Sequence, residues 1–326
     1  MTTIPRPGPA RITLALLAAA PAAMAYPWPT PRDRWVLAVG VLVLIVLLGW
    51  WQGLHFTTML RRRLAMSRSG SGLHTGRGAA DDTRATAVLR VAPSDGGPGA
   101  LPVALVAGYL DRYGLRADAV RITSRDVRSG SDAPAHDTWI GLTYSAAANL
   151  PALQARSSSI PLRQTVDVAA RRLADQLREA GWDAVTVGAD ELPDLIGPSA
   201  HETWGAVTDG PAGCVAVYQV GVDGALADNL NRIRSAEVPE AWTVLEIAGS
   251  DQRPTVAAAC ALRTATAPVG TAPLSGLVPE QGNHRSALVT LNPLSGRRID
   301  GHTTLPAGDL AALRWPVAPV KAAAAR

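Results

Sequence analysis

The sequence predicts a membrane-anchored α+β protein, in which an N-terminal two-helix transmembrane hairpin precedes a mixed α/β cytoplasmic domain. Three observations lead to this fold class: two long apolar runs near the N-terminus, an arginine cluster after the second run, and interleaved helix and strand patterns in the remaining chain. The predicted parts are a membrane hairpin at 1–66, a linker at 67–83, a cytoplasmic α/β domain at 84–268, and an irregular C-terminal arm and tail at 269–326.

The two apolar runs cover residues 12–28 and 35–56 and contain no Asp, Glu, Lys or Arg. At about 1.5 Å per residue, the second run is long enough to cross the bilayer core of about 30 Å. The first run admits two interpretations. One is a first membrane helix, rich in alanine for close packing and joined to the second by a tight turn. The other is the apolar core of a signal peptide, because Ala23-Met24-Ala25 fits a cleavage pattern.

The residues that flank the second run predict its orientation. Three consecutive arginines begin at Arg61, and no acidic residue follows them until Asp81. Basic flanks stay on the cytoplasmic side, so we expect the large C-terminal domain in the cytoplasm. Tryptophan and phenylalanine residues stand at both ends of the run, where interfacial aromatic belts lie. The predicted membrane-interface anchors are Trp35, Trp50, Trp51, Phe56, Arg61, Arg62 and Arg63.

The distribution of charge argues against a nucleic-acid partner. The formal net charge is +4, but residues 1–78 hold nine of the 31 Lys and Arg residues and only Asp33 of the 27 acidic residues. The remainder of the chain is therefore net acidic. Because nucleic-acid binding domains carry a basic surface, we expect the lipid bilayer as a partner and no nucleic acid.

After a Gly- and Ser-rich linker, the pattern of the large domain alternates between strands and helices. The clearest helix is 165–182, where apolar residues recur at Val166, Ala170, Leu173 and Leu177. The segment 102–115 is predicted to contain a second helix that ends at Gly114, and a third helix is predicted at 225–235. Strands are predicted at 85–93, 118–126, 138–146, 183–190, 204–208, 214–220, 242–250 and 255–266, with a hairpin loop between the second and third.

No chemical motif stands out in the large domain. Cys214 and Cys260 lie in apolar runs, which is typical of buried thiols, and the histidines lack metal-ligand spacing. Neither a nucleotide-binding glycine loop nor a G-x-S-x-G elbow is present. His201 and Glu202 are the most tempting pair, but neighbours on a strand point to opposite faces, so a structural or surface role is favoured. We therefore predict no catalytic, cofactor-binding or metal-binding residues.

The order of these segments resembles the EccE family, membrane components of mycobacterial type VII (ESX) secretion systems. The resemblance runs from Arg34 to about Ser295 and is most similar to the short form from the ESX system linked to iron and zinc acquisition. It rests on "RWVLAVGVLVLIVLLGWWQG", "ATAVLRV", "LPVALVAGYLDRYGLRADAVRITSRD", "NLPALQARSSSIPLRQTVDVAARRLADQLREAGW", "HETW", "EAWTVLEIAGS" and "HRSALVTLNPLS".

The resemblance implies two N-terminal helices in the inner membrane, which favours the hairpin over the signal peptide, and a cytoplasmic domain. It also implies assembly with EccB, EccC and EccD, where EccC is the ATPase and EccD is the most direct partner. The expected function is that of a structural, non-catalytic subunit without cofactors. The alternative is that the α/β domain is a ligand-binding or degenerate-enzyme domain, tethered to the membrane, that regulates secretion.

Overall fold

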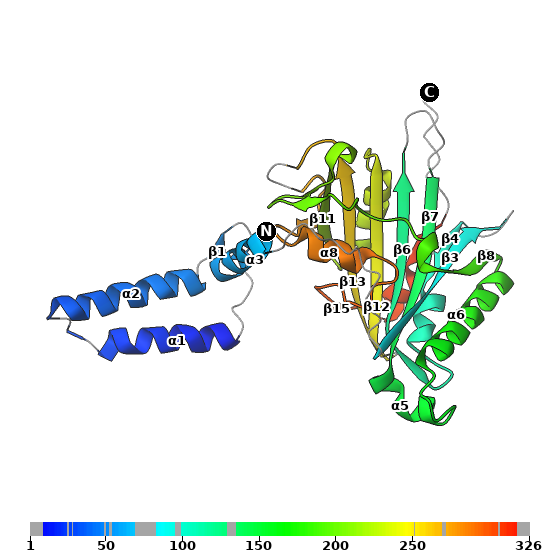
Figure 1. Cartoon of the computed structure of the whole chain (residues 1–326), viewed down its shortest axis with the longest axis horizontal. Helices are drawn as coiled ribbons and strands as arrows, with labels where there is room; N and C mark the ends of the chain where they lie inside the picture. Colours follow the sequence, from blue (N-terminus) through cyan, green and yellow to red (C-terminus); the bar gives the residue numbers. More distant parts are fainter. Residues whose placement is uncertain are drawn as a thin grey trace. The chain divides into compact units, whose positions relative to one another are not determined.

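The computed structural model describes residues 9–24, 26–27, 29–48, 50–51, 54–68, 83–94, 99–128, 135–250, 252–268, 272–305 and 307–317. The chain divides into two compact units, Met1–Gly70 and Ser71–Arg326, called unit 1 and unit 2 below (Figure 1).

The described residues of unit 1 form three helices and a short β-hairpin. Helices α1 (Pro9–Met24) and α2 (Pro31–Leu48) lie side by side, and α3 (Phe56–Arg68) follows the hairpin of β1 (Trp50–Trp51) and β2 (Leu54–His55) (Figure 1). A cap fixes the start of α2. In this cap, Thr30 Oγ1 accepts a hydrogen bond from the Asp33 amide at 3.3 Å and donates one to the Asp33 carboxylate at 2.7 Å. Proline at the first helical position suits this start.

The predicted transmembrane hairpin is wrong. Among the residues that the structure describes, no helix combines the length and the apolar character that a bilayer crossing requires. Helix α1 has 16 residues and is about 24 Å long. The first turn of α2 contains Arg32, Asp33 and Arg34, so its apolar part is only about 21 Å long, against about 30 Å of hydrocarbon. The prediction counted residues beyond Leu48 as helix, whereas the chain enters β1 there.

Unit 2 is organised around one antiparallel sheet with the strand order β8-β3-β7-β6-β12-β13-β11-β10-β9. Its long strands are β3 (Arg84–Pro93), β6 (Leu115–Val127), β7 (Ala135–Ser145), β8 (Trp182–Val187), β11 (Cys214–Val220), β12 (Glu240–Ser250) and β13 (Arg253–Thr264). The shorter strands of this sheet are β5 (Asp111–Arg112), β9 (His201–Glu202), β10 (Val207–Thr208), β14 (Leu277–Pro279) and β15 (Thr303–Thr304). A separate two-stranded sheet pairs β4 (Ala100–Pro102) with β16 (Arg314–Pro316).

The helices of unit 2 vary in length, and the longest is α6. They are α4 (Val103–Ala107), α5 (Ala146–Gln154), α6 (Leu162–Glu179), α7 (Leu226–Ser235), α8 (His284–Leu291) and α9 (Ala307–Ala312), with 3-10 turns η1 (Gly108–Leu110), η2 (Ala189–Glu191) and η3 (Gly210–Ala212). The four apolar positions predicted for the buried face of α6 are all buried.

The sheet has apolar cores on both faces because neighbouring residues of a strand point to opposite sides. Leu89 belongs to the larger core, which also contains Leu173 from α6. Val88 belongs to the second core, which contains the stacked Trp139 and Trp242 and Leu288 from α8. Helices α6 and α8 therefore cover opposite faces of one sheet, and Figure 1 shows α8 crossing β13 and β11.

In unit 2, most of the predicted strands are present, and two other segments differ from the prediction. The helix predicted at 102–115 is shorter, because α4 passes into η1 and the chain then turns tightly between β5 and β6. The arm predicted as irregular at 269–326 contains α8, α9 and three short strands within its described residues. Cys214 and Cys260 are buried free thiols, and their burial agrees with the prediction.

Candidate functional site

The most unusual feature of unit 2 is an ion pair buried in the middle of the sheet. Arg121 on β6 stands directly opposite Glu246 on β12, and their side chains are 4% and 0% exposed. Arg121 donates from Nε to Glu246 at 3.1 Å and from a terminal nitrogen to the same carboxylate oxygen. A charge at such a position is stable only with a partner and further hydrogen bonds.

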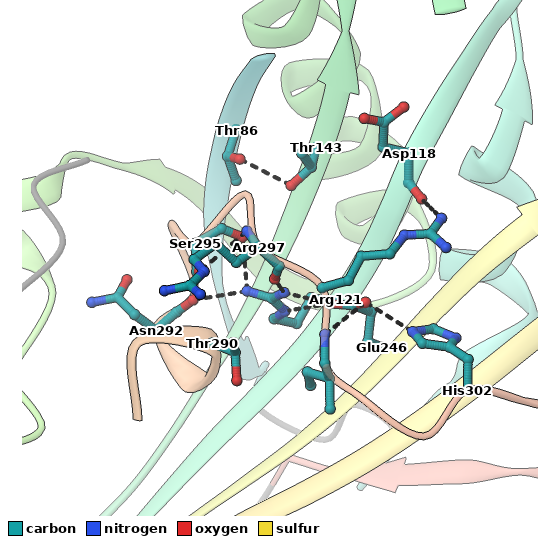
Figure 2. A network of polar contacts seen from close by, with 12 residues as sticks. Thr86, Asp118, Arg121, Thr143, Glu246, Thr290, Asn292, Ser295, Arg297 and His302 are labelled. Atoms are coloured by element: carbon teal, nitrogen blue, oxygen red, sulfur yellow. Dashed lines mark hydrogen bonds and ion pairs between the residues drawn. The ribbon is translucent and has the colours of Figure 1, made fainter. Parts of the chain in front are cut away.

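The remaining bonds of this pair hold the C-terminal arm on the sheet (Figure 2). Arg121 also donates to the backbone carbonyls of Asn292, Ser295 and Arg297 at 3.0, 2.8 and 2.6 Å. Glu246 accepts from the Ile299 amide at 3.2 Å. One buried pair thus binds four backbone groups of the arm.

His302 completes the arrangement from the other side of the carboxylate (Figure 2). Its Nε2 lies 2.9 Å from Glu246, and its Nδ1 lies 3.1 Å from Thr255 Oγ1. Burial by itself raises the pKa of Glu246, but the hydrogen bond from His302 and the charge of Arg121 outweigh it and hold the pKa below its usual range. We call Arg121, Glu246 and His302 the arm clasp.

The close approach of the arm also explains a glycine in the middle of β7. A Cβ at Gly141 would lie 2.6 Å from the carbonyl oxygen of Pro293. A strand glycine commonly marks a place where another backbone comes close. The arm therefore crosses the sheet at a position that accepts no side chain.

A second charged cluster lies toward the other end of the same sheet face. Glu240 on β12 accepts from Arg125 at 2.6 Å, from Arg263 at 2.7 Å and from the Trp242 indole at 3.0 Å. Arg263 also donates to Asp209 at 2.9 Å. Burial raises the pKa of Glu240, but the bonds from the two arginines outweigh it and lower that pKa. This cluster ties the loop before β11 to the sheet.

A cleft of about 320 Å³ lies beside this second cluster, and Arg90, Arg125, Trp139, Asp190 and Glu191 are among its lining residues. Ligand pockets are usually about 300–1,000 Å³ and mostly apolar. The volume of this cleft lies at the lower end of that range, and its lining carries charges of both signs. It therefore gives little support to a small-molecule site.

The structure assigns a structural role to one of the two residues singled out in "HETW". His201 is exposed, whereas Glu202 accepts a hydrogen bond from the Arg285 amide at 3.1 Å, at the start of α8. Within the described ranges, no group of three or more His, Cys, Asp or Glu side chains is arranged to hold a metal ion.

The predicted membrane-interface anchors all fall in unit 1. Trp35 on α2 is 72% exposed, Arg61 and Arg63 on α3 are exposed, and Arg62 is half-buried. Trp50 and Trp51 form β1 and Phe56 begins α3, but their side chains lie outside the described residues. Many apolar side chains of the helix pair are exposed, among them Ile12, Leu14, Leu16 and Leu17 on α1 and Val39, Leu42 and Ile45 on α2.

Comparison with known proteins identifies the family. The chain is 49% identical over 320 residues to the "ESX-3 secretion system protein EccE3" of Mycobacterium tuberculosis, which covers 97% of this chain and 95% of that protein. The chain belongs to the EccE family. The protein of the same name from Mycolicibacterium smegmatis is 46% identical over 297 residues, or 91% of each chain. A family model described as "Putative type VII ESX secretion system translocon, EccE" matches residues 133–248.

Membership of the EccE family confirms the resemblance and makes the chain a type VII secretion component. The segment that matches the EccE model extends from before β7 into β12 and includes both Glu240 and Glu246. Sequence reasoning missed the arm clasp, although a signal was present. Glu246 interrupts the apolar run "WTVLEIA", and a charged residue inside a buried strand requires a partner.

Proposed function

We propose that this chain is a non-catalytic structural subunit of a type VII secretion complex at the inner membrane. The identity of 49% along nearly the whole chain to an ESX-3 secretion protein is the observation that carries the proposal. Its partners are the other membrane components EccB, EccC and EccD, with EccD as the most direct contact. The ATPase activity resides in EccC, and this subunit contributes surfaces to which the other components bind.

The described part of unit 2 supports a structural role. Its most deeply buried charges, Arg121 and Glu246, are fully engaged in holding the backbone of the arm. Catalytic groups are instead poised toward a cleft, with a perturbed pKa that serves proton transfer. A buried pair that fixes the arm on the sheet has a structural role, and such a role suits a scaffold subunit.

The exposed side chains of unit 1 support a location at the membrane surface. Leu16, Leu17, Leu42 and Ile45 are each more than half exposed, and such apolar surface is unfavourable in water. Helix α3 follows with the arginines 61–63, and basic side chains beside apolar ones favour the anionic cytoplasmic leaflet. We therefore propose that unit 1 lies in the interfacial layer of the inner membrane, at its cytoplasmic leaflet.

Co-purification from the native host tests the proposal. The full chain and a variant lacking residues 1–70 carry the same C-terminal tag, and membranes are solubilised in mild detergent. Mass spectrometry then quantifies every bound subunit. We expect EccB, EccC and EccD with the full chain, and a large loss with the shortened variant. Recovery of the full chain alone, while the other subunits remain assembled with one another, would overturn the proposal.

A further inference from the structure

The turn between β5 and β6 has an unusual residue at its first position. Strand β5 pairs with β6 so that Arg112 stands opposite Leu115, which leaves Tyr113 and Gly114 as a two-residue loop. Their φ angles are 56° and 70°. Positive φ at both positions is the signature of a type I′ turn, which favours Asn, Asp or Gly first and Gly second. A tyrosine there is strained, so the turn itself does not explain it.

The tyrosine ring is instead part of a stack with two arginines. The guanidinium carbon of Arg172 on α6 lies 4.6 Å from the ring centre of Tyr113, and that of Arg112 lies 5.3 Å from it. Arg112 also lies 5.0 Å from the ring centre of Tyr109, which is buried. These distances fall within the range of cation–π attraction. We call Arg112, Tyr113 and Arg172 the Arg–Tyr platform.

The guanidinium groups of the platform carry N–H donors that remain available to a partner. Within the described residues, no hydrogen bond or ion pair joins the guanidinium groups of Arg112 and Arg172 to a protein acceptor, and Tyr113 is 49% exposed. Arg156 adds a third cation, because its guanidinium donates to the Tyr113 carbonyl at 3.4 Å. Each guanidinium has five N–H donors in a fork that matches a carboxylate.

We propose that the Arg–Tyr platform docks an acidic segment of a partner protein, an inference that rests on the proposed function. Arginine and tyrosine are among the residues most enriched at the hot spots of protein interfaces, and two guanidinium forks without protein acceptors match the geometry of carboxylates. A lipid surface fits less well. Membrane-binding faces carry uninterrupted basic clusters, whereas Asp111 lies on the same hairpin and Asp167 on the same helix.

Site-specific crosslinking in the assembled complex tests this proposal. Val168 is 40% exposed and lies one helical turn before Arg172 on α6, so a photoreactive amino acid there samples the platform without altering it. The full chain with this substitution is expressed in the native host and irradiated, and the crosslinked peptide is identified by mass spectrometry. We expect a segment of another secretion subunit with several Asp or Glu residues.

Three variants of the crosslinkable chain make the test specific. The double variant Arg112→Glu and Arg172→Glu should reduce the crosslink at least tenfold, and lysine substitutions in the acidic partner segment should restore it. Tyr113→Asn should reduce the crosslink at least threefold without lowering Tm, because asparagine suits the turn. Arg178→Glu on the same helix is the matched control and should leave the crosslink unchanged.

The outcomes separate this proposal from the proposed function. The docking site alone is overturned if the secretion subunits co-purify normally but the double variant leaves the crosslink unchanged. The same holds if the crosslink joins the chain to lipid, to a second copy of this chain or to a neutral segment. A native chain that co-purifies with no secretion subunit overturns both.

Discussion

Replacing Glu246 with glutamine removes one charge from the arm clasp and keeps the shape of the side chain. Arg121 is 4% exposed and would be left without its counter-ion. Breaking a buried ion pair by removing one partner costs about 3–5 kcal/mol. Because about 1 kcal/mol shifts Tm by roughly 2–4 °C in a domain of about 150–250 residues, close to the size of unit 2, we expect Tm to fall by roughly 6–20 °C.

Thermal unfolding of the purified full chain measures this loss. The matched control is Arg178→Met, which removes a pair between Arg178 and Asp175 whose side chains are 56% and 61% exposed. Exposed pairs contribute about 1 kcal/mol at most, so the control should shift Tm by less than about 4 °C. The double variant Arg121→Met with Glu246→Leu should lose less than the sum of its single variants, because no buried charge is left unpaired. If Glu246→Gln unfolds within about 2 °C of the native chain, the reasoning about the clasp is refuted.

Three further predictions follow from the same structure. Folding lowers the pKa of Glu246, so the ionised carboxylate stabilises the fold fully above its unfolded pKa of about 4.3. This stabilisation is lost as the pH falls through the lower pKa of the folded state. The difference in Tm between the native chain and Glu246→Gln should therefore narrow below about pH 4. Gly141→Val should push the Pro293 carbonyl away and cost about 1–3 kcal/mol, measured by unfolding and by faster protease cleavage in the arm, whereas unchanged cleavage would argue against the close crossing. Glutamate at all three positions 61–63 should abolish flotation of the full chain with anionic vesicles, while Arg178→Glu should not; equal flotation of both would contradict the interfacial placement of unit 1.

The parts of the fold that the sequence predicted well are those governed by local periodicity. The helical spacing of apolar residues located α6, and the alternating segments before and after a polar loop located β6 and β7. In both cases the pattern of a single segment determines which side chains are buried.

The errors arose where chain direction changes without a strong local signal. The apolar run after Trp35 has no charge to mark its end, yet α2 stops at Leu48 and a hairpin follows. The predicted helix at 102–115 contains a turn whose first residue is Tyr113, a residue that hairpin rules do not favour. Composition alone could not reveal either break.

The arm clasp was out of reach for a different reason. Arg121, Glu246 and His302 come from three distant segments, and only the pairing of β6 with β12 and the return of the arm bring them together. A buried acidic residue signals that a partner exists, but the sequence does not say which basic residue supplies it. Two leucines of the arm, Leu288 and Leu291, are buried in the finished fold.

The measurement that tests the central claim most directly is the size of the secretion complex in a native host that lacks this chain. Membranes are solubilised gently, the complex is resolved by native electrophoresis, and export of type VII substrates is measured in the same strain. We predict that the full-size complex and export are lost without the chain and return when the native chain is supplied. A complex of unchanged size that still exports its substrates would contradict a structural role in secretion.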